Sequence, residues 1–206
     1  MKETDDLLKK GLDELDIPWT DMHIDAFRIF LFELKKWNKV HNLTGLTTDR
    51  DIIVKHFLDS LLFLKVLPDS AVTVADIGSG AGFPGIPVKI MAPRLKMFLL
   101  EPVKKKAVFL RHICGKLGLE KIEVLDRRIE DVEGLRVDAA MTRALYGVGD
   151  FIEKTGRILA AQGVLILSKG PRLREELEGL DVRNITVSDI KLPFAGTTRH
   201  LVLVRR

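Results

Sequence analysis

Val74-Ala75-Asp76-Ile77-Gly78-Ser79-Gly80-Ala81-Gly82-Phe83-Pro84-Gly85 is the stretch of the sequence that decides the fold. Its apolar beginning predicts a buried strand, its glycines predict a sharp turn, and the residues beyond them predict a helix. Glycine allows a positive φ, and it lets a ligand lie directly against the peptide backbone. A strand, a glycine-rich turn and a helix in this order are typical of the first unit of a cofactor-binding α/β domain.

Two cofactors could use this turn. Gly80-x-Gly82-x-x-Gly85 matches the dinucleotide fingerprint, so a nicotinamide-dependent enzyme has to be considered. The frame directly after the strand is Gly78-x-Gly80-x-Gly82, however, with Phe83 where the third glycine should stand. Pro84 and Pro87 also have no N–H group to offer to a pyrophosphate. S-adenosylmethionine carries no phosphate and is therefore the favoured ligand, with Asp76 positioning the loop and the amino-acid end of this methyl donor.

Strands and helices alternate on both sides of this turn. The apolar runs that predict strands are Val72–Ile77, Met97–Leu100, Ile122–Leu125, Val137–Thr142 and Val164–Ser168. Their nearly continuous apolar character fits parallel strands that are covered on both faces. Lys104–Leu117 and Asp150–Ala161 predict helices between them. Ile185–Leu192 and His200–Val204, joined by the turn-like Gly196–Arg199, predict an antiparallel hairpin. The expected fold class is α/β, a doubly wound, mostly parallel sheet with a C-terminal antiparallel hairpin, as in Rossmann-like methyltransferases.

The first 67 residues follow a helical pattern instead. A stripe of apolar residues marks a long second helix, and it consists of Ile24, Phe27, Leu31 and Leu34. Thr48-Asp49-Arg50-Asp51 predicts the start of a third helix, and Pro68-Asp69-Ser70 ends the pattern. We therefore expect a helical N-terminal region, residues 1–67, packed on a catalytic domain, residues 68–206.

Charge and composition limit the class of protein. The chain of 206 residues has a formal net charge of +4. Residues 1–70 hold 10 Lys/Arg against 13 Asp/Glu, whereas residues 71–206 hold 23 against 16. This surplus fits a surface that faces a polyanion, and a simply solvated basic surface stays open as the alternative. The sequence has one cysteine and neither a signal peptide nor an apolar run of about 20 residues. We therefore expect a cytoplasmic location and no membrane contact.

Acidic residues at the ends of the next strands extend the candidate cofactor site. Glu101 closes the second strand, about 20 residues beyond the glycine turn, where a carboxylate that holds a ribose diol is expected. A solvated acid at a strand end is the alternative for a lone glutamate. Ile129-Glu130 follows the third strand, where such folds hold an adenine.

The fourth and fifth strands end in cations that are candidates for the reaction itself. Thr142-Arg143-Ala144 lacks the Asn/Asp-Pro-Pro-aromatic element of amino-methylating DNA enzymes, and Cys114 has the helical spacing of a core residue rather than that of a nucleophile. This leaves an acceptor that needs no activation, such as a guanine N7. Arg143 could orient a base or phosphate or complete the donor site. Lys169 could meet an RNA phosphate or cap the strand end. No metal is expected.

His56, Asp59 and Ser60 share one helical face. A hydrolytic triad would require groups that converge from separate elements, together with a nucleophile elbow, which the sequence lacks. We therefore interpret this face as a polar surface that meets the second domain.

The chain resembles a known family, the 16S ribosomal RNA guanine-N7 methyltransferases, also called glucose-inhibited division protein B. The matching elements cover almost the whole chain and include Asn42-Leu43-Thr44, His56–Leu61, Gly78–Pro87, Arg128-Ile129-Glu130, Thr142-Arg143-Ala144, Lys169-Gly170 and Arg199-His200-Leu201. The resemblance implies a bacterial cytoplasmic enzyme that methylates guanine 527 (RNA numbering), with 16S ribosomal RNA or a small-subunit particle as its partner, and a monomer is expected. It also implies which residues contact the methyl donor, and they are Gly78, Phe83, Ile129, Glu130 and Arg143. Ser79 stands where threonine is usual in the family.

Two other classes of function remain open at this point. A small-molecule methyltransferase would need a closed pocket rather than an open basic surface. A non-catalytic protein that binds RNA or senses the donor would keep the glycine turn without turnover.

Overall fold

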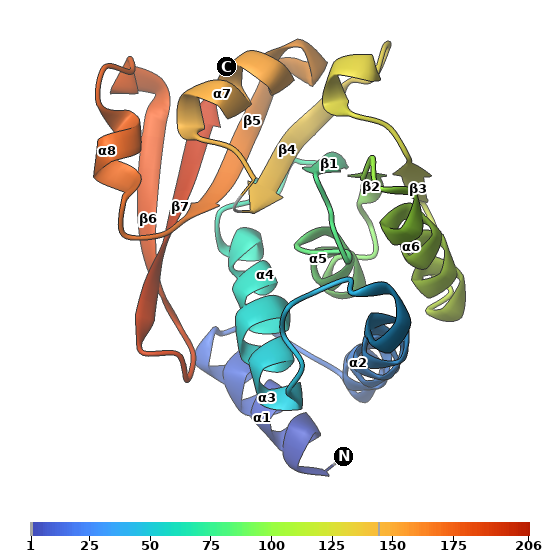
Figure 1. The fold of residues 1–206 in the computed structure, drawn as a ribbon. Coiled ribbons are helices and arrows are strands. Elements are labelled where there is room, and N and C mark those ends of the chain that lie inside the picture. The colour runs from blue at the N-terminus through green and yellow to red at the C-terminus, as the bar shows by residue number, and fades with distance from the viewer. Residues whose placement is uncertain (1, 144) are drawn as a thin grey trace.

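The computed structural model of the chain describes residues 2–143 and 145–206. Within these residues, seven strands form one sheet in the order β3-β2-β1-β4-β5-β7-β6 (Figure 1). The strands are β1 Thr73–Ile77, β2 Lys96–Leu100, β3 Ile122–Leu125, β4 Val137–Arg143, β5 Leu159–Lys169, β6 Ile185–Leu192 and β7 Thr197–Arg205. The first five pair in parallel, and β7 pairs antiparallel with β5 and β6. The predicted fold class is therefore confirmed.

Helices cover both faces of this sheet. They are α1 Lys2–Glu14, α2 Asp21–His41, α3 Asp49–Ile52, α4 Asp59–Leu61, α5 Gly85–Met91, α6 Lys104–Lys116, α7 Val148–Thr155 and α8 Leu173–Leu177. Neighbouring residues of one strand pack into different hydrophobic clusters. Val74 belongs to the cluster that contains α5, α6 and the N-terminal helices, whereas Ala75 belongs to the cluster that contains α7. This two-sided burial explains why the central parallel strands are nearly continuous apolar runs.

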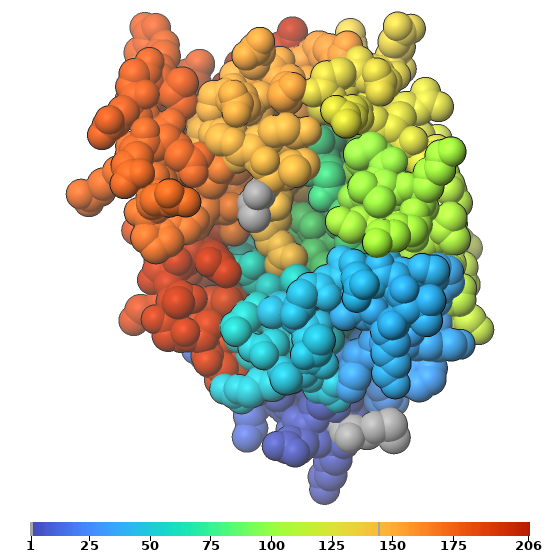
Figure 2. All heavy atoms as spheres, in the orientation of Figure 1, coloured from blue at the N-terminus to red at the C-terminus, as the bar shows by residue number. Residues whose placement is uncertain are grey.

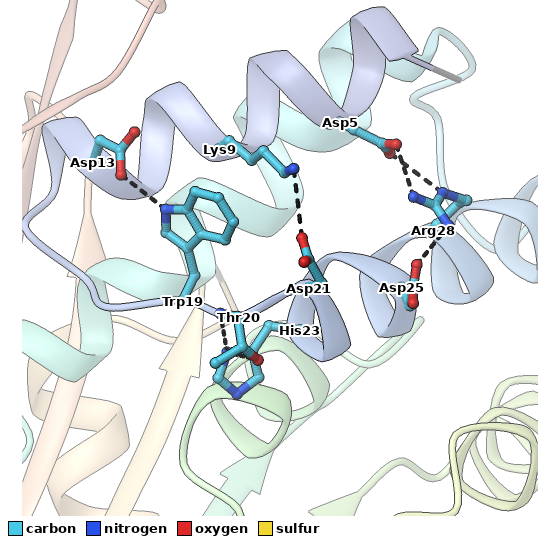
Figure 3. Close-up of polar contacts among 9 residues, drawn as sticks. All are labelled: Asp5, Lys9, Asp13, Trp19, Thr20, Asp21, His23, Asp25 and Arg28. Atoms are coloured by element: carbon cyan, nitrogen blue, oxygen red, sulfur yellow. Dashed lines mark hydrogen bonds and ion pairs between the residues drawn. The ribbon is translucent and has the colours of Figure 1, made fainter.

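The N-terminal helices lie against the outer side of α5 and α6. A stack of aromatic rings joins them to the turn after β1, because the ring of Phe30 lies 5.3 Å from that of Phe57, within the N-terminal region, and 5.2 Å from that of Phe83, in the turn. Polar contacts join α1 to α2 at their surface, and the ion pair of Arg28 with Asp5, at 2.8 Å, is one of them (Figure 3). The two parts of the chain therefore share one apolar core.

The third predicted helix is one irregular helical segment. Thr48 caps it as expected, because its hydroxyl accepts a hydrogen bond from the Asp51 amide at 3.1 Å. The helix then widens into a π-helical turn over Ile53–Leu58, before α4, and it ends in a 3₁₀ turn over Leu62–Lys65. Widened turns of this kind are common at functional sites. Here the widened turn carries His56.

One predicted helix is partly wrong. Asp150–Ala161 was expected to be helical throughout, but α7 ends at Thr155 and β5 begins at Leu159. The backbone of Leu159 pairs with that of Val137 in β4, and this pairing overrides the high helix propensity of Ala160 and Ala161. The last hairpin also turns earlier than expected, over residues 193–196, so that Thr197–Arg199 already belong to β7.

Candidate active site

The glycine turn after β1 has the backbone that its sequence predicts. Gly78, Gly80 and Gly82 have φ angles of +74°, +58° and +99°, which favour glycine. The amides of Gly78 and Ser79 donate to the Leu100 carbonyl at 2.9 and 3.0 Å. The turn is therefore held against the end of β2, where an acidic residue follows.

Asp76 fixes the start of the helix beyond the turn. One of its carboxylate oxygens, Oδ2, accepts a hydrogen bond from the Gly85 amide at 2.8 Å. A Cβ atom at position 85 would lie 2.7 Å from the same oxygen, so only glycine fits there. Within the described residues, the other oxygen, Oδ1, is buried and has no hydrogen-bond partner. Burial raises the pKa of Asp76 to about 7.

Glu101 connects the turn to the end of β2. Its Oε2 accepts from the Gly80 amide and its Oε1 from the Val103 amide, both at 2.8 Å. The residue is 4% exposed. Each oxygen keeps a further lone pair, so the carboxylate can brace the turn and still accept hydrogen bonds from a ligand.

A cavity of about 430 Å³, which we call the loop cavity, opens beside the turn. It has the size of a small-molecule site. Its lining consists of Ile77, Gly78, Gly80, Leu100, Glu101, Pro102, Val103, Lys106, Arg127, Arg128, Ile129, Glu130, Leu145, Tyr146 and Lys154. The cavity thus brings together five of the predicted cofactor residues, and these are Gly78, Gly80, Glu101, Ile129 and Glu130. The Glu130 carboxylate is paired with Lys154 at 2.5 Å, and this hydrogen bond holds the pKa of Glu130 below its usual range.

Phe83 and Gly82 lie elsewhere. Phe83 is 6% exposed in the apolar core, and its ring stacks on that of His56 with 4.3 Å between the centroids. Gly82 packs closely on Ile86. Neither residue lines the loop cavity, so a direct donor contact from either one stays a prediction.

A second cavity of about 620 Å³, the arginine cavity, lies at the same edge of the sheet. Figure 2 shows this face hollowed between the N-terminal helices below and the segments that follow β4 and β5 above. The lining of the arginine cavity consists of Lys55, His56, Asp59, Arg143, Leu145, Tyr146, Gly147, Ser168, Lys169, Gly170, Pro171, Arg172, Glu176 and Arg199. Leu145 and Tyr146 line both cavities, and so they form a shared wall.

Arg143 is held by the N-terminal region. Its guanidinium donates to the Lys55 carbonyl at 2.9 Å, to Asp59 at 3.1 Å and to His56 Nδ1 at 2.9 Å. The other oxygen of Asp59 accepts from Arg199 Nε at 2.7 Å. The polar helix face that was expected to meet the second domain does so, because His56 and Asp59 both contact the end of β4.

His56 is a neutral acceptor in this network. Burial, with the nearby Arg143 charge, lowers the pKa of His56 to about 3. Because an arginine only donates, His56 Nδ1 accepts, and Nε2 then carries the hydrogen that faces the Thr44 hydroxyl at 2.7 Å. Cys114, also considered as a reactive group, is buried, and burial raises the pKa of its thiol to about 11.

Lys169 occupies the predicted place at the end of β5, but its charge is engaged. It is 8% exposed, pairs with Glu176 at 2.7 Å and donates to the Tyr146 carbonyl. This placement is deeper than the outer surface that a phosphate would reach, and its contact with RNA phosphate stays a prediction.

Sequence reasoning gave no role in the site itself to several residues that build the arginine cavity, although it placed Asp59 on the polar face that meets the second domain. They are Asp59, Arg199, Leu145, Tyr146 and Glu176. For Asp59 and Arg199 a signal existed, because both stand in blocks that resemble the family. For the other three, only the fold shows that they meet at one cavity.

A sheet of this order, a glycine turn after β1 and a carboxylate after β2 define a Rossmann-like S-adenosylmethionine-dependent methyltransferase. Solved structures agree on the fold. A ribosomal protein L11 methylase from Lactobacillus delbrueckii subsp. bulgaricus is similar with a TM-score of 0.58, at 15% identity, over 79% of this chain and 81% of that one. A SAM dependent methyltransferase from Aquifex aeolicus has a TM-score of 0.54, at 21% identity, over 75% and 92%.

The sequence model of the family GidB, rRNA small subunit methyltransferase G, matches residues 23–202. Two relatives called ribosomal RNA small subunit methyltransferase G are each 36% identical. The one from Pelotomaculum thermopropionicum is matched over 97% of this chain and 89% of its own length, and the one from Francisella tularensis subsp. tularensis over 98% and 97%. The chain belongs to this family, and the family activity is S-adenosylmethionine-dependent methylation of a guanine N7 in 16S rRNA.

Proposed function

We propose that this enzyme methylates guanine 527 of 16S rRNA by holding the methyl donor in the loop cavity and the guanine in the arginine cavity. The observation that carries the proposal is that Leu145 and Tyr146 line both cavities, so that the two cavities are neighbours at the carboxyl edge of the sheet. Ligands of open α/β sheets bind at this edge.

The residues of the loop cavity fit S-adenosylmethionine. When bound, this donor supplies a methyl group on a positively charged sulfur. The side chain of Leu145 lies against Gly78, whereas a Cβ atom at Gly80 would meet nothing closer than the Gly78 carbonyl at 3.9 Å, so a ligand can approach the turn closely at Gly80. Glu101 offers carboxylate oxygens that accept from two ribose hydroxyls. Asp76 braces the end of the turn through Oδ2, which accepts from the Gly85 amide, while its Oδ1 stays buried and unpartnered within the described residues.

The proposed reaction needs no general base. The lone pair of N7 forms the bond to the methyl carbon, the pair of the broken carbon–sulfur bond stays on sulfur, and no proton leaves the guanine. The histidine of the site agrees with this, because His56 lines the arginine cavity as a neutral acceptor for Arg143. Cys114 lines neither cavity, and its buried thiol has a raised pKa. Rate acceleration then comes from orientation, which can supply up to about 7–11 kcal/mol.

Arg143 is the residue that we propose for this orientation. It lines the arginine cavity, and three contacts from the N-terminal region fix its guanidinium. We propose on this basis that residues 1–67 act as a region that completes the site of residues 68–206, and that Lys169 acts within the same cavity.

The test is single-turnover methylation of 16S rRNA with labelled donor, with the modified base mapped by primer extension. Arg143→Ala should lower the rate strongly and change the donor affinity little, whereas Arg183→Ala, at an exposed arginine that pairs with Asp181, should change neither. The rate should also lack a rising limb from a base with a pKa near 7. A wild-type enzyme that leaves 16S rRNA unmodified would refute the proposed function.

The charge of the arginine cavity favours RNA over a small uncharged acceptor. Five cationic side chains and two carboxylates line it, and the cationic ones are Lys55, Arg143, Lys169, Arg172 and Arg199.

Among residues 2–143 and 145–206, no cluster of acidic, histidine or cysteine side chains could hold a metal ion, and no helix has the length and apolarity to cross a bilayer. We propose a monomer that meets its RNA in the cytoplasm.

A further inference from the structure

The arginine cavity contains a carboxylate that differs from the others near the site. Asp59 is 4% exposed, and each of its oxygens already accepts from an arginine. Glu176, in α8, has a side chain that is 32% exposed and lines the cavity. Its Oε2 accepts from Lys169 at 2.7 Å and from the Val148 amide at 3.2 Å. Within the described part of the chain, no hydrogen bond reaches its Oε1.

Guanine presents groups that complement this pair. Its N1–H and N2–H₂ are donors that a carboxylate accepts, and its O6 is an acceptor that an ammonium group satisfies. Adenine reverses two of these groups, because it has an amine in place of O6 and a lone pair at N1. It would therefore place a donor against Lys169 and an acceptor against Glu176, and both contacts are unfavourable.

We infer that Glu176 reads the N1–H and N2–H₂ edge of the target guanine while Lys169 donates to its O6. The inference rests on the proposed function. In this arrangement Glu176 and Lys169 select guanine, and Arg143 orients it for the transfer. N7 neighbours O6 in the purine, so a guanine held at O6 by Lys169 has N7 beside the same contact. The burial of Lys169, paired at the end of β5, fits a base in a cavity better than a phosphate outside it.

The test compares guanosine with inosine at the target position of a 16S rRNA that is ligated from synthetic pieces and assembled into small-subunit particles. Inosine keeps N1–H and O6 but lacks the N2 amine. Competition between the two particles gives the ratio of their kcat/KM values. The wild-type enzyme should prefer guanosine by roughly ten-fold or more, which is the loss that follows removal of a hydrogen bond to a charged group.

Glu176→Gln should lower the rate on guanosine and bring the ratio toward one, with the donor affinity unchanged by calorimetry. Glu175→Gln is the matched control, because Glu175 is exposed in the same helix and does not line the cavity, and it should keep the wild-type ratio. Equal wild-type rates on both particles, or a Glu176→Gln variant that keeps the full ratio, would overturn the inference. Equal wild-type rates would overturn the inference even if Glu176→Gln does not fold. A wild-type enzyme that modifies neither particle would instead refute the proposed function.

Discussion

Asp59 is the residue whose loss should affect the stability of this fold most clearly. Its carboxylate is 4% exposed and accepts from Arg143 at 3.1 Å and from Arg199 at 2.7 Å, so it joins the N-terminal helical region to β4 and β7. Asp59→Ala removes the only acid that pairs with either arginine within the described residues. Arg143, with a side chain that is 15% exposed, would keep a largely buried charge without a counterion.

The expected loss follows from this burial. Removing one partner of a buried ion pair lowers the free energy of unfolding by about 3–5 kcal/mol, because the remaining charge is left uncompensated. Arg199 is 29% exposed and can recover part of its hydration, which places the expected value in the lower half of this range. For a chain of this size each kcal/mol shifts the melting temperature by about 2–4 °C, so a fall of at least about 6 °C is expected.

Chemical denaturation of wild type and variant measures this loss directly. Asp25→Ala is the matched control, because Asp25 forms an exposed ion pair with Arg28 at 2.5 Å, and such pairs contribute about 0–1 kcal/mol. If Asp59→Ala lost no more free energy of unfolding than Asp25→Ala, the reasoning from burial would be wrong.

Three further predictions concern the donor, the RNA and pH. Glu101→Ala should lower donor affinity about ten-fold or more in calorimetry, and an unchanged affinity would rule out its ribose contact. Affinity for 16S rRNA should fall steeply with salt, since phosphate contacts release counterions, while donor affinity changes little; a salt-independent RNA affinity would contradict this. Burial raises the pKa of Asp76 from 3.8 to about 7, so the folded protein keeps a proton there that the unfolded chain has lost. The stability from this group is full below about pH 4 and is lost as the pH rises to about 7. Denaturation between pH 5 and pH 7 should therefore show wild type losing stability relative to Asp76→Asn, and parallel curves would contradict it.

The sequence predicts the sheet well because each strand is defined locally. A run such as Ile122–Leu125 is short, mostly apolar and bounded by polar residues, and the strand has those bounds. The prediction fails at Asp150–Ala161, where α7, a 3₁₀ turn and the start of β5 follow one another directly. There only the pairing of Leu159 with Val137, a contact between distant parts of the chain, sets the boundary.

The residues of the site also differ in how far the local sequence predicts them. The glycine turn and Glu101 are predictable because a fixed spacing after a strand places them at one edge of the sheet. Phe83 lies in that turn as well, yet its ring packs on Phe30 of α2 in the core, which the local pattern does not reveal. Glu176 lies in the five-residue helix α8 and belongs to no sequence motif. Its place in the site follows only from its ion pair with Lys169 in the structure.

The wall between the two cavities contains Tyr146, and the chain has a single tyrosine. An isotope label on tyrosine rings would therefore give the spectrum of one ring that borders both proposed binding sites. The donor would shift this signal from one side and the RNA from the other, and each partial complex would have its own spectrum. The protein thus contains a built-in reporter of the order in which its two substrates arrive.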